Sequence, residues 1–232
     1  MTERGEDAGA VRVALAEKLT GDEFSCVAGK TAWLRGTVVH QHFGEMSAPA
    51  TTRELHEAVV DFVAHKDEID PLMATFAASF AGPFGLTEQE FETALWQQLQ
   101  DLHELDATRF GWDPAVDSDP ASPRFGFSLG GHAFFVVGLH ANASRTTRRF
   151  RYPTMVFNSH LQFERLRERG AYTRIQSQVQ AREMALQGSL NPNLADFGEA
   201  SEAAQYSGRA VEDDWTCPFH PRIAANLSGE AR

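Results

Sequence analysis

The sequence is poor in cysteine and contains no long apolar run. Cys26 and Cys217 are its only two cysteines, and they form neither a CxxC pair nor a zinc-type cluster. In a reducing cytoplasm both are expected to be free thiols. No segment approaches the roughly 20 apolar residues that cross a bilayer, and residues 1–10 lack the basic and apolar regions of a secretion signal. These absences predict a soluble, cytoplasmic protein with no membrane partner.

Positive charge is also scarce. The chain has 21 Lys and Arg residues against 32 Asp and Glu residues, for a formal net charge of −11. Such a field repels a phosphate backbone, which argues against a nucleic-acid partner, and it favours small cationic molecules. Hydrophobic residues, in contrast, make up 42% of the chain, and 17 residues are Phe. A chain of this length can bury a sizeable core, and flat apolar side chains suit both packing and the wall of a planar ligand.

The spacing of apolar residues predicts an α+β fold. Helical periodicity is found at residues 8–19, from Thr52 to Val63, after the capping box Thr87–Glu90, and at 161–169 and 172–187. Strand-like patterns occur at 24–43, 72–80, 125–129, 132–139 and 154–158. Gly130-Gly131 joins two of these into a hairpin. We expect one domain over residues 1–232, with a mainly antiparallel sheet packed by helices and flexible tails at 1–7 and about 222–232.

Two histidines follow apolar strands at positions that suit a metal ligand. His140 ends the run 132–139, which carries Phe134 and Phe135, and His160 follows the strand 154–158 in the same way. A b-type haem needs one axial ligand from rigid backbone and apolar surface on both sides of the ring. We therefore predict that His140 holds the iron beside the wall made by Phe134 and Phe135, with His160 as the rival ligand or a neighbour.

The segment between these strands is rich in arginine. Arg145, Arg148, Arg149 and Arg151 lie within seven residues of an otherwise acidic chain. A solvated face is the ordinary explanation of such a run, but arginine also pairs with carboxylates through two hydrogen bonds, and haem carries two propionates. The pattern predicts that Arg145, Arg148 or Arg149 contacts a propionate.

Two other ligand sets remain open. A thiolate from Cys26 or Cys217 would push electron density onto haem iron and favour O–O cleavage. His40 and His42 are spaced so that a strand would turn both rings to one face, which permits a non-haem metal site, although no third ligand stands at a recognised spacing.

Several segments resemble the YqcI/YcgG family, and specifically its branch that includes the haem-dependent pre-guanitoxin N-hydroxylase. The resemblance covers nearly the whole chain and rests on 24–28 (FSCVA), 95–99 (LWQQL), 131–140 (GHAFFVVGLH), 144–150 (SRTTRRF), 157–164 (FNSHLQFE), 187–192 (QGSLNP), 205–209 (QYSGR) and 215–219 (WTCPF). The chain departs from the expected pattern at Ser25 and Ala141.

The resemblance implies a b-type haem, O₂ as co-substrate and oxidation of a nitrogen in a small guanidine, amine or aminoimidazole. The chain lacks a GxGxxG fingerprint for a nicotinamide or flavin, so an external electron donor, a reductase, is expected. Glu164 and Asp196 are candidate carboxylates for a cationic substrate. A non-catalytic haem carrier or gas sensor and a non-haem metal oxygenase are the alternatives, and a homodimer is one open arrangement.

Overall fold

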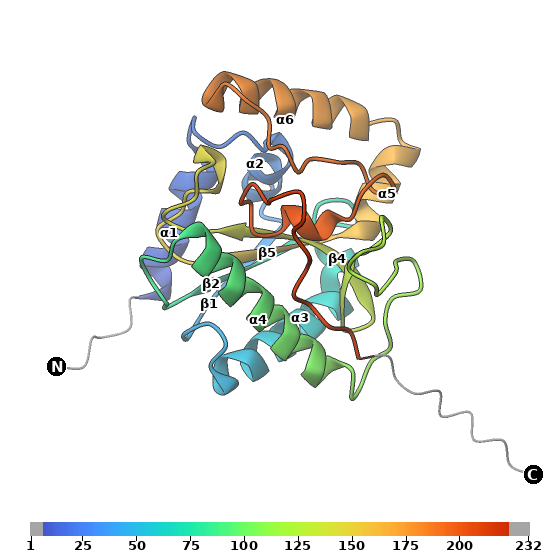
Figure 1. Cartoon of the computed structure of the whole chain (residues 1–232). Helices are drawn as coiled ribbons and strands as arrows, with labels where there is room; N and C mark the ends of the chain where they lie inside the picture. Colours follow the sequence, from blue (N-terminus) through green and yellow to red (C-terminus); the bar gives the residue numbers. More distant parts are fainter. Residues whose placement is uncertain (1–6, 223–232) are drawn as a thin grey trace, which may run out of the picture.

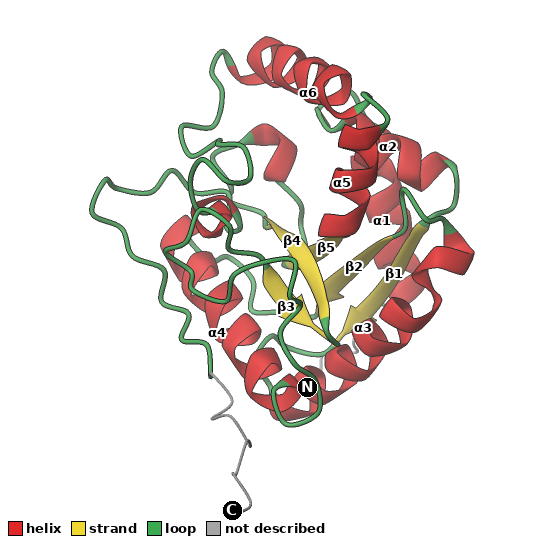
Figure 2. Ribbon diagram, turned by 90° about the vertical axis from the view of Figure 1, so that its right-hand side faces the viewer, coloured by secondary structure: helices red, strands yellow, loops and turns green. Residues whose placement is uncertain are grey.

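The computed structural model describes residues 7–222 and shows one five-stranded sheet between two groups of helices (Figures 1 and 2). The helices are α1 Ala8–Thr20, α2 Val27–Leu34, α3 Pro49–Ile69, α4 Glu88–Asp106, α5 His160–Glu168 and α6 Tyr172–Gln187, with two 3-10 turns, η1 Thr146–Arg148 and η2 Glu202–Gln205. The strands are β1 Val38–Phe43, β2 Thr75–Phe80, β3 Phe127–Leu129, β4 His132–Leu139 and β5 Thr154–Ser159. The expected tails at 1–7 and 222–232 lie almost wholly outside the described residues.

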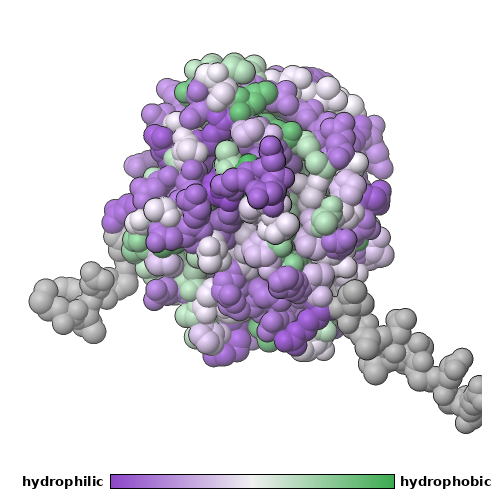
Figure 3. Space-filling view, in the orientation of Figure 1, coloured by the Kyte–Doolittle hydropathy of each residue, from purple (hydrophilic) through white to green (hydrophobic). Residues whose placement is uncertain are grey.

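The sheet has the strand order β1-β2-β5-β4-β3. Its β1–β2 pair is parallel and the other three pairs are antiparallel, which confirms the α+β fold with a mainly antiparallel sheet. The hairpin is also confirmed, because Gly130 and Gly131 both adopt positive φ angles, 62° and 69°, in the two-residue turn between β3 and β4. None of the helices within 7–222 is long and apolar enough to cross a bilayer, and the face in Figure 3 is largely hydrophilic.

The two faces of the sheet carry different cores. Phe134, Val136 and Phe157 point to the side covered by α3 and α4, where the larger apolar cluster lies. The alternate residues Val137 and Leu139 point to the opposite side, where α1 and α2 pack. Figure 1 shows this division, with α3 and α4 below the sheet and α2 and α6 above it. Because side chains alternate along a strand, one residue step along β4 changes the core that a side chain joins.

Helix α4 forms as its sequence predicts. The Thr87 hydroxyl accepts a hydrogen bond from the Glu90 backbone N–H, and the Glu90 carboxylate accepts one from the Thr87 N–H. The backbone N–H groups of Thr87 and Glu90, which have no carbonyl partner within the helix, are both satisfied in this way. The buried stripe of the helix includes Phe91, Leu95 and Leu99 and faces the sheet.

Three boundaries differ from the sequence-based expectation. Residues 27–34, expected as part of a strand, form helix α2, and only 38–43 form a strand. Helix α3 begins at Pro49, three residues before Thr52, because proline fits the first turn of a helix. His160 opens α5 rather than closing a strand, and its imidazole is thereby part of a helix N-terminus.

Gly138 of β4 packs closely against side chains of α4. A Cβ at this position would lie 2.6 Å from Phe91 Cε1 and 3.0 Å from the Tyr206 carbonyl oxygen. Gly138→Ala is therefore expected to lower the free energy of unfolding by about 1–3 kcal/mol through overpacking. Urea denaturation measures this loss. Gly111→Ala is the matched control, because nothing lies within 4 Å of its Cβ, and an equal loss in both variants would contradict the close-approach explanation.

Candidate functional site

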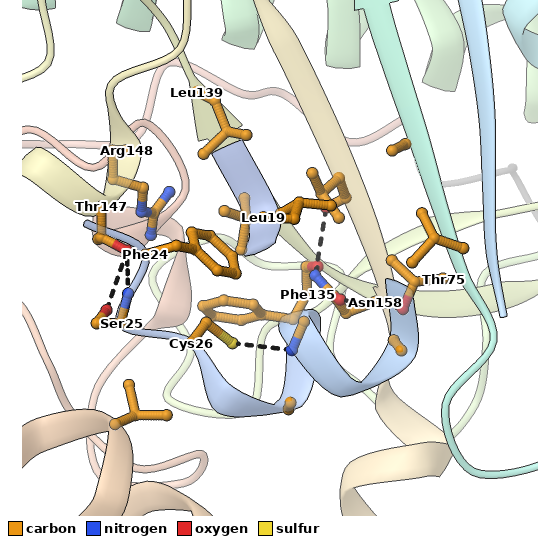
Figure 4. Close-up of a pocket in the computed structure, with 18 of the residues that line it drawn as sticks. Leu19, Phe24, Ser25, Cys26, Thr75, Phe135, Leu139, Thr147, Arg148 and Asn158 are labelled. Carbon is orange, nitrogen blue, oxygen red and sulfur yellow. Dashed lines mark hydrogen bonds between the residues drawn. The ribbon is translucent and has the colours of Figure 1, made fainter. Parts of the chain in front are cut away.

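A cavity of about 340 Å³ lies on the α1/α2 side of the sheet (Figure 4). Its floor is formed by sheet residues including Ala77, Phe135, Val137, Leu139 and Val156, and its walls come from α1, α2, α5 and α6. The volume falls within the range of roughly 300–1,000 Å³ that small-molecule sites occupy. Its lining is mainly apolar, and its charged side chains, Arg145, Arg148 and Glu183, lie at the end near η1. The cavity therefore combines an apolar chamber with a charged end.

Cys26 lines this cavity at the N-terminus of α2. Its Sγ accepts a hydrogen bond from the Gly29 backbone N–H at 3.3 Å, so the thiol acts as the N-cap of the helix. Burial raises the pKa of Cys26, while the N–H groups of Gly29 and Ala28 and the charge of Arg148 act in the opposite direction. The neutral thiol is thus favoured in the unliganded chain, yet the donors that would stabilise a metal-bound thiolate are already in place.

Arg145 is 7% exposed and lines the same cavity with unsatisfied donors. Its Nη1 donates to the Ser189 carbonyl and hydroxyl oxygens at 3.0 Å, and its Nε lies 3.4 Å from Glu183 Oε1 as an ion pair. Neither Nε nor Nη2 makes a hydrogen bond in the described chain. Buried guanidinium groups are normally satisfied, so an anionic ligand group would complete this side chain.

Arg148 is held by backbone carbonyl groups. Its Nη1 donates to the carbonyl oxygens of Gly138 at 3.0 Å and Tyr206 at 3.2 Å, and its Nη2 donates to that of Gln205 at 3.1 Å. Burial lowers the pKa of Arg148 to about 10, which still leaves it charged at neutral pH. These three neutral acceptors fix the guanidinium at the cavity without neutralising it.

Glu183 is the one acidic side chain that lines the cavity among the described residues. Its Oε2 accepts from the Ser25 hydroxyl at 2.7 Å, across 158 residues of sequence. Ser25 also contacts Thr147, which accepts a hydrogen bond from the Ser25 backbone N–H at 3.1 Å. With Arg145 and Arg148 facing one carboxylate, the charged end has an excess of positive charge in a chain whose formal net charge is −11.

The predicted site residues are divided between the two sides of the sheet. Phe135, Arg145 and Arg148 line the cavity. Phe134 is fully buried in the α3/α4 core. Arg149 donates to the carbonyl oxygens of Ala143 at 2.8 Å and Ser144 at 3.2 Å and so closes its own loop.

Neither predicted histidine ligand borders the cavity. His140 is 3% exposed and stacks on Phe91 of α4, with ring centroids 4.3 Å apart, and its Nδ1 has no hydrogen-bond partner among residues 7–222. His160 Nε2 lies 2.9 Å from Glu202 Oε1, and both side chains are buried. The structure therefore brings together three of the seven predicted residues and places His140 across the sheet from them.

The other candidate ligands are also outside the cavity, apart from Cys26. Cys217 packs against the α3/α4 core, and burial raises its pKa to about 12. His40 Nε2 and His42 Nδ1 both contact Ser79 Oγ, at 2.8 and 3.2 Å, which confirms that they share a face.

No group of three or more His, Cys, Asp or Glu side chains able to hold a metal ion occurs within 7–222. Glu164 and Asp196 do not line the cavity either.

Sequence reasoning missed Glu183 and Thr147. Both are ordinary polar residues within their segments, and only the fold brings them to Ser25. The available signal was the i,i+4 spacing of Val179 and Glu183, which places both on one face of α6. That spacing does not say which face is turned inward.

The fold and the cavity define a single-sheet α+β protein with an apolar chamber that ends in two buried arginines. The chain belongs to the YqcI/YcgG family, whose model matches residues 15–220. No curated protein and no solved structure matches the chain.

Proposed function

We propose that this protein is a haem- and O₂-dependent N-oxygenase and that the haem occupies the cavity between the sheet and α2. The observation that carries the proposal is the position of Cys26, a partly buried thiol at a helix N-terminus beside an apolar chamber and two buried arginines. Family membership adds support, because segments by which the sequence resembles the YqcI/YcgG family form much of this cavity.

The donors around the cavity fit such a group. Cys26 supplies a soft sulfur ligand, and the Gly29 N–H that bonds its Sγ would temper the charge of a bound thiolate. Phe135, Val137 and Leu139 offer an apolar surface to a flat ring. Among the four residues that the sequence offered as haem ligands, His140, His160, Cys26 and Cys217, only Cys26 borders this cavity, so we place it before His140.

Arg145 is the proposed partner of a propionate. Its free Nη2 would gain a charge-assisted hydrogen bond worth about 1.5–3 kcal/mol, which corresponds to roughly tenfold or more in affinity. Arg145→Met is therefore expected to weaken hemin binding by roughly that factor while leaving the affinity for hemin dimethyl ester, which has no free carboxylate, unchanged. Absorbance titrations with both compounds measure the difference. Arg149→Met is the control, and equal weakening toward both compounds would contradict this role.

When bound, the haem would supply O₂ activation with electrons from an external donor. The residues of the chain would bind and orient the haem and the substrate, and they would exclude water. The apolar walls keep water from the reacting centre. Glu183, the one acidic side chain that lines the cavity within residues 7–222, would hold Arg145 toward a propionate through its ion pair with the Arg145 Nε at 3.4 Å.

Product formation tests the proposal. Protein supplied with hemin, an electron donor and O₂ is expected to convert a member of a guanidine, amine and aminoimidazole panel to a hydroxylamine or nitro product detected by mass spectrometry. Labelled O₂ should appear in the product. Haem binding with no oxidation of any member would instead support the carrier or gas-sensor alternative.

A further inference from the structure

Tyr206 is a fully buried tyrosine whose hydroxyl lies in a chain of titratable groups. Its O–H lies 2.5 Å from Glu202 Oε1, and the same oxygen is 2.9 Å from His160 Nε2. The Tyr206 oxygen also accepts a hydrogen bond from the Phe127 backbone N–H at 3.1 Å. The Phe134 carbonyl oxygen, at 3.1 Å, is a second acceptor for the same proton, and Glu202 Oε1 is the closer of the two.

Glu202 is well suited to take a proton from this hydroxyl. It is 4% exposed, and burial raises its pKa, which makes the carboxylate a better base than an exposed one. Because an ionised Glu202 can only accept, the Nε2 of His160 carries the hydrogen of their shared bond. The fold therefore provides an internal proton acceptor for Tyr206.

The ring of Tyr206 connects this network to the cavity. It makes a T-shaped contact with the ring of Phe135, which lines the cavity, with ring centroids 5.6 Å apart. On its other side it stacks on Trp96 at 5.4 Å and 17°. Trp96 in turn contacts Phe219, and Phe219 contacts the partly exposed Trp112, at 6.2 and 6.0 Å. Aromatic rings thus run from the cavity wall past Tyr206 to the surface.

Proton acceptors distinguish Tyr206 from Trp96 as the site of oxidation. Oxidised phenol is stabilised when its proton leaves, and Tyr206 has Glu202 beside it. The buried Nε1 of Trp96 has no hydrogen-bond partner in the described chain, so a tryptophan cation there would keep its charge in an apolar setting.

We propose that Tyr206 is a redox-active residue that donates one electron to a one-electron oxidant in the cavity and passes its proton to Glu202. The oxidant, of the class of metal centres raised to high potential by O₂ or peroxide, is reduced by one electron. The Tyr206 O–H bond breaks, its proton moves to Glu202 Oε1, and the products are a neutral phenoxyl ring and a neutral carboxylic acid. An external donor returns the electron, and the proton moves back.

Photo-oxidation of the haem-free protein tests this without relying on the proposed N-oxygenase. Light and a cobalt(III) ammine acceptor generate ruthenium(III) tris-bipyridine, and freeze-quenched samples are examined by electron paramagnetic resonance. The wild-type protein is expected to give a tyrosyl signal that narrows when tyrosine is ring-deuterated. The chain has three tyrosines, so substitution assigns the signal.

The signal should disappear in Tyr206→Phe and remain in Tyr152→Phe and Tyr172→Phe. Tyr172 is an informative control, because its hydroxyl lies 3.4 Å from the Asp196 carboxylate. Glu202→Gln, which keeps the ring but removes the base, should lower the yield of the signal. A signal that survives Tyr206→Phe, an unchanged yield in Glu202→Gln, or a wild-type signal insensitive to tyrosine deuteration would overturn the proposal. The last two outcomes decide the question even where Tyr206→Phe does not fold.

Discussion

Cys26→Ser is expected to remove the thiolate signature from the spectrum of the hemin-loaded protein. It is also expected to weaken hemin binding by roughly 10- to 100-fold or more. In metal sites, loss of a residue that only hydrogen-bonds to a ligand already lowers metal affinity by about this factor. Oxygen is a poorer ligand than sulfur for soft coordination, and serine preserves the size and the cap of α2. Absorbance titration and the reduced, CO-bound spectrum measure both effects.

The same spectra discriminate among the remaining candidate ligands. His140→Ala, His160→Gln and Cys217→Ser should keep the wild-type spectrum, since none of these side chains lines the cavity. A spectrum that changes in His140→Ala and not in Cys26→Ser would restore His140 as the ligand and place the haem on the α4 side of the sheet.

Phe134→Ala is expected to change mainly the stability of the protein, and Phe135→Ala mainly its affinity for hemin, although the two residues are neighbours. Phe134 is 0% exposed in the α3/α4 core, so its truncation should lower the free energy of unfolding by about 3–5 kcal/mol. Phe135 faces the cavity, so its truncation should cost less stability and should enlarge the chamber, changing hemin affinity. Urea denaturation and hemin titration of both variants provide the comparison.

Phe84→Ala is the control for this pair. Its ring is 55% exposed, so the substitution should change stability by no more than about 0.5 kcal/mol. If Phe135→Ala were as destabilising as Phe134→Ala and left hemin binding intact, the cavity would not be the haem site.

The elements that local chemistry defines were predictable from the sequence. Helix α4 has a capping box, and the β3–β4 hairpin has two glycines at its turn, so each carries its own start or stop signal. Helix α2 carried no such signal, because its N-cap is Cys26 and it contains Gly29. Cysteine is not among the preferred N-caps, and an internal glycine weakens helical periodicity.

The position of His140 shows which part of the site the alternation of side chains along a strand can predict. Alternation along β4 groups residue 140 with Phe134 and Val136 rather than with Phe135 and Leu139. The sequence therefore held the information that His140 and Phe135 face opposite sides. Which side encloses a cavity depends on how α1, α2 and α6 pack, and that is decided by distant parts of the chain.

The meeting of Ser25 and Glu183 with Arg145 could not be predicted from the sequence for the same reason. Ser25, Arg145 and Glu183 come from three segments separated by more than 30 residues, and no local pattern links them. The arginine run led to the prediction of a propionate contact, which stays a prediction, and two of its members make different contacts. Arg148 donates hydrogen bonds to backbone carbonyl oxygens beside the cavity, whereas Arg149 donates to carbonyl oxygens of the loop that precedes it.

Titration of the haem-free protein with hemin tests the central claim most directly. The account predicts a saturable Soret band at one hemin per chain, with a thiolate-type spectrum that is lost in Cys26→Ser. A protein that stays without such a band at stoichiometric hemin, or that binds hemin identically with and without the Cys26 sulfur, would contradict it.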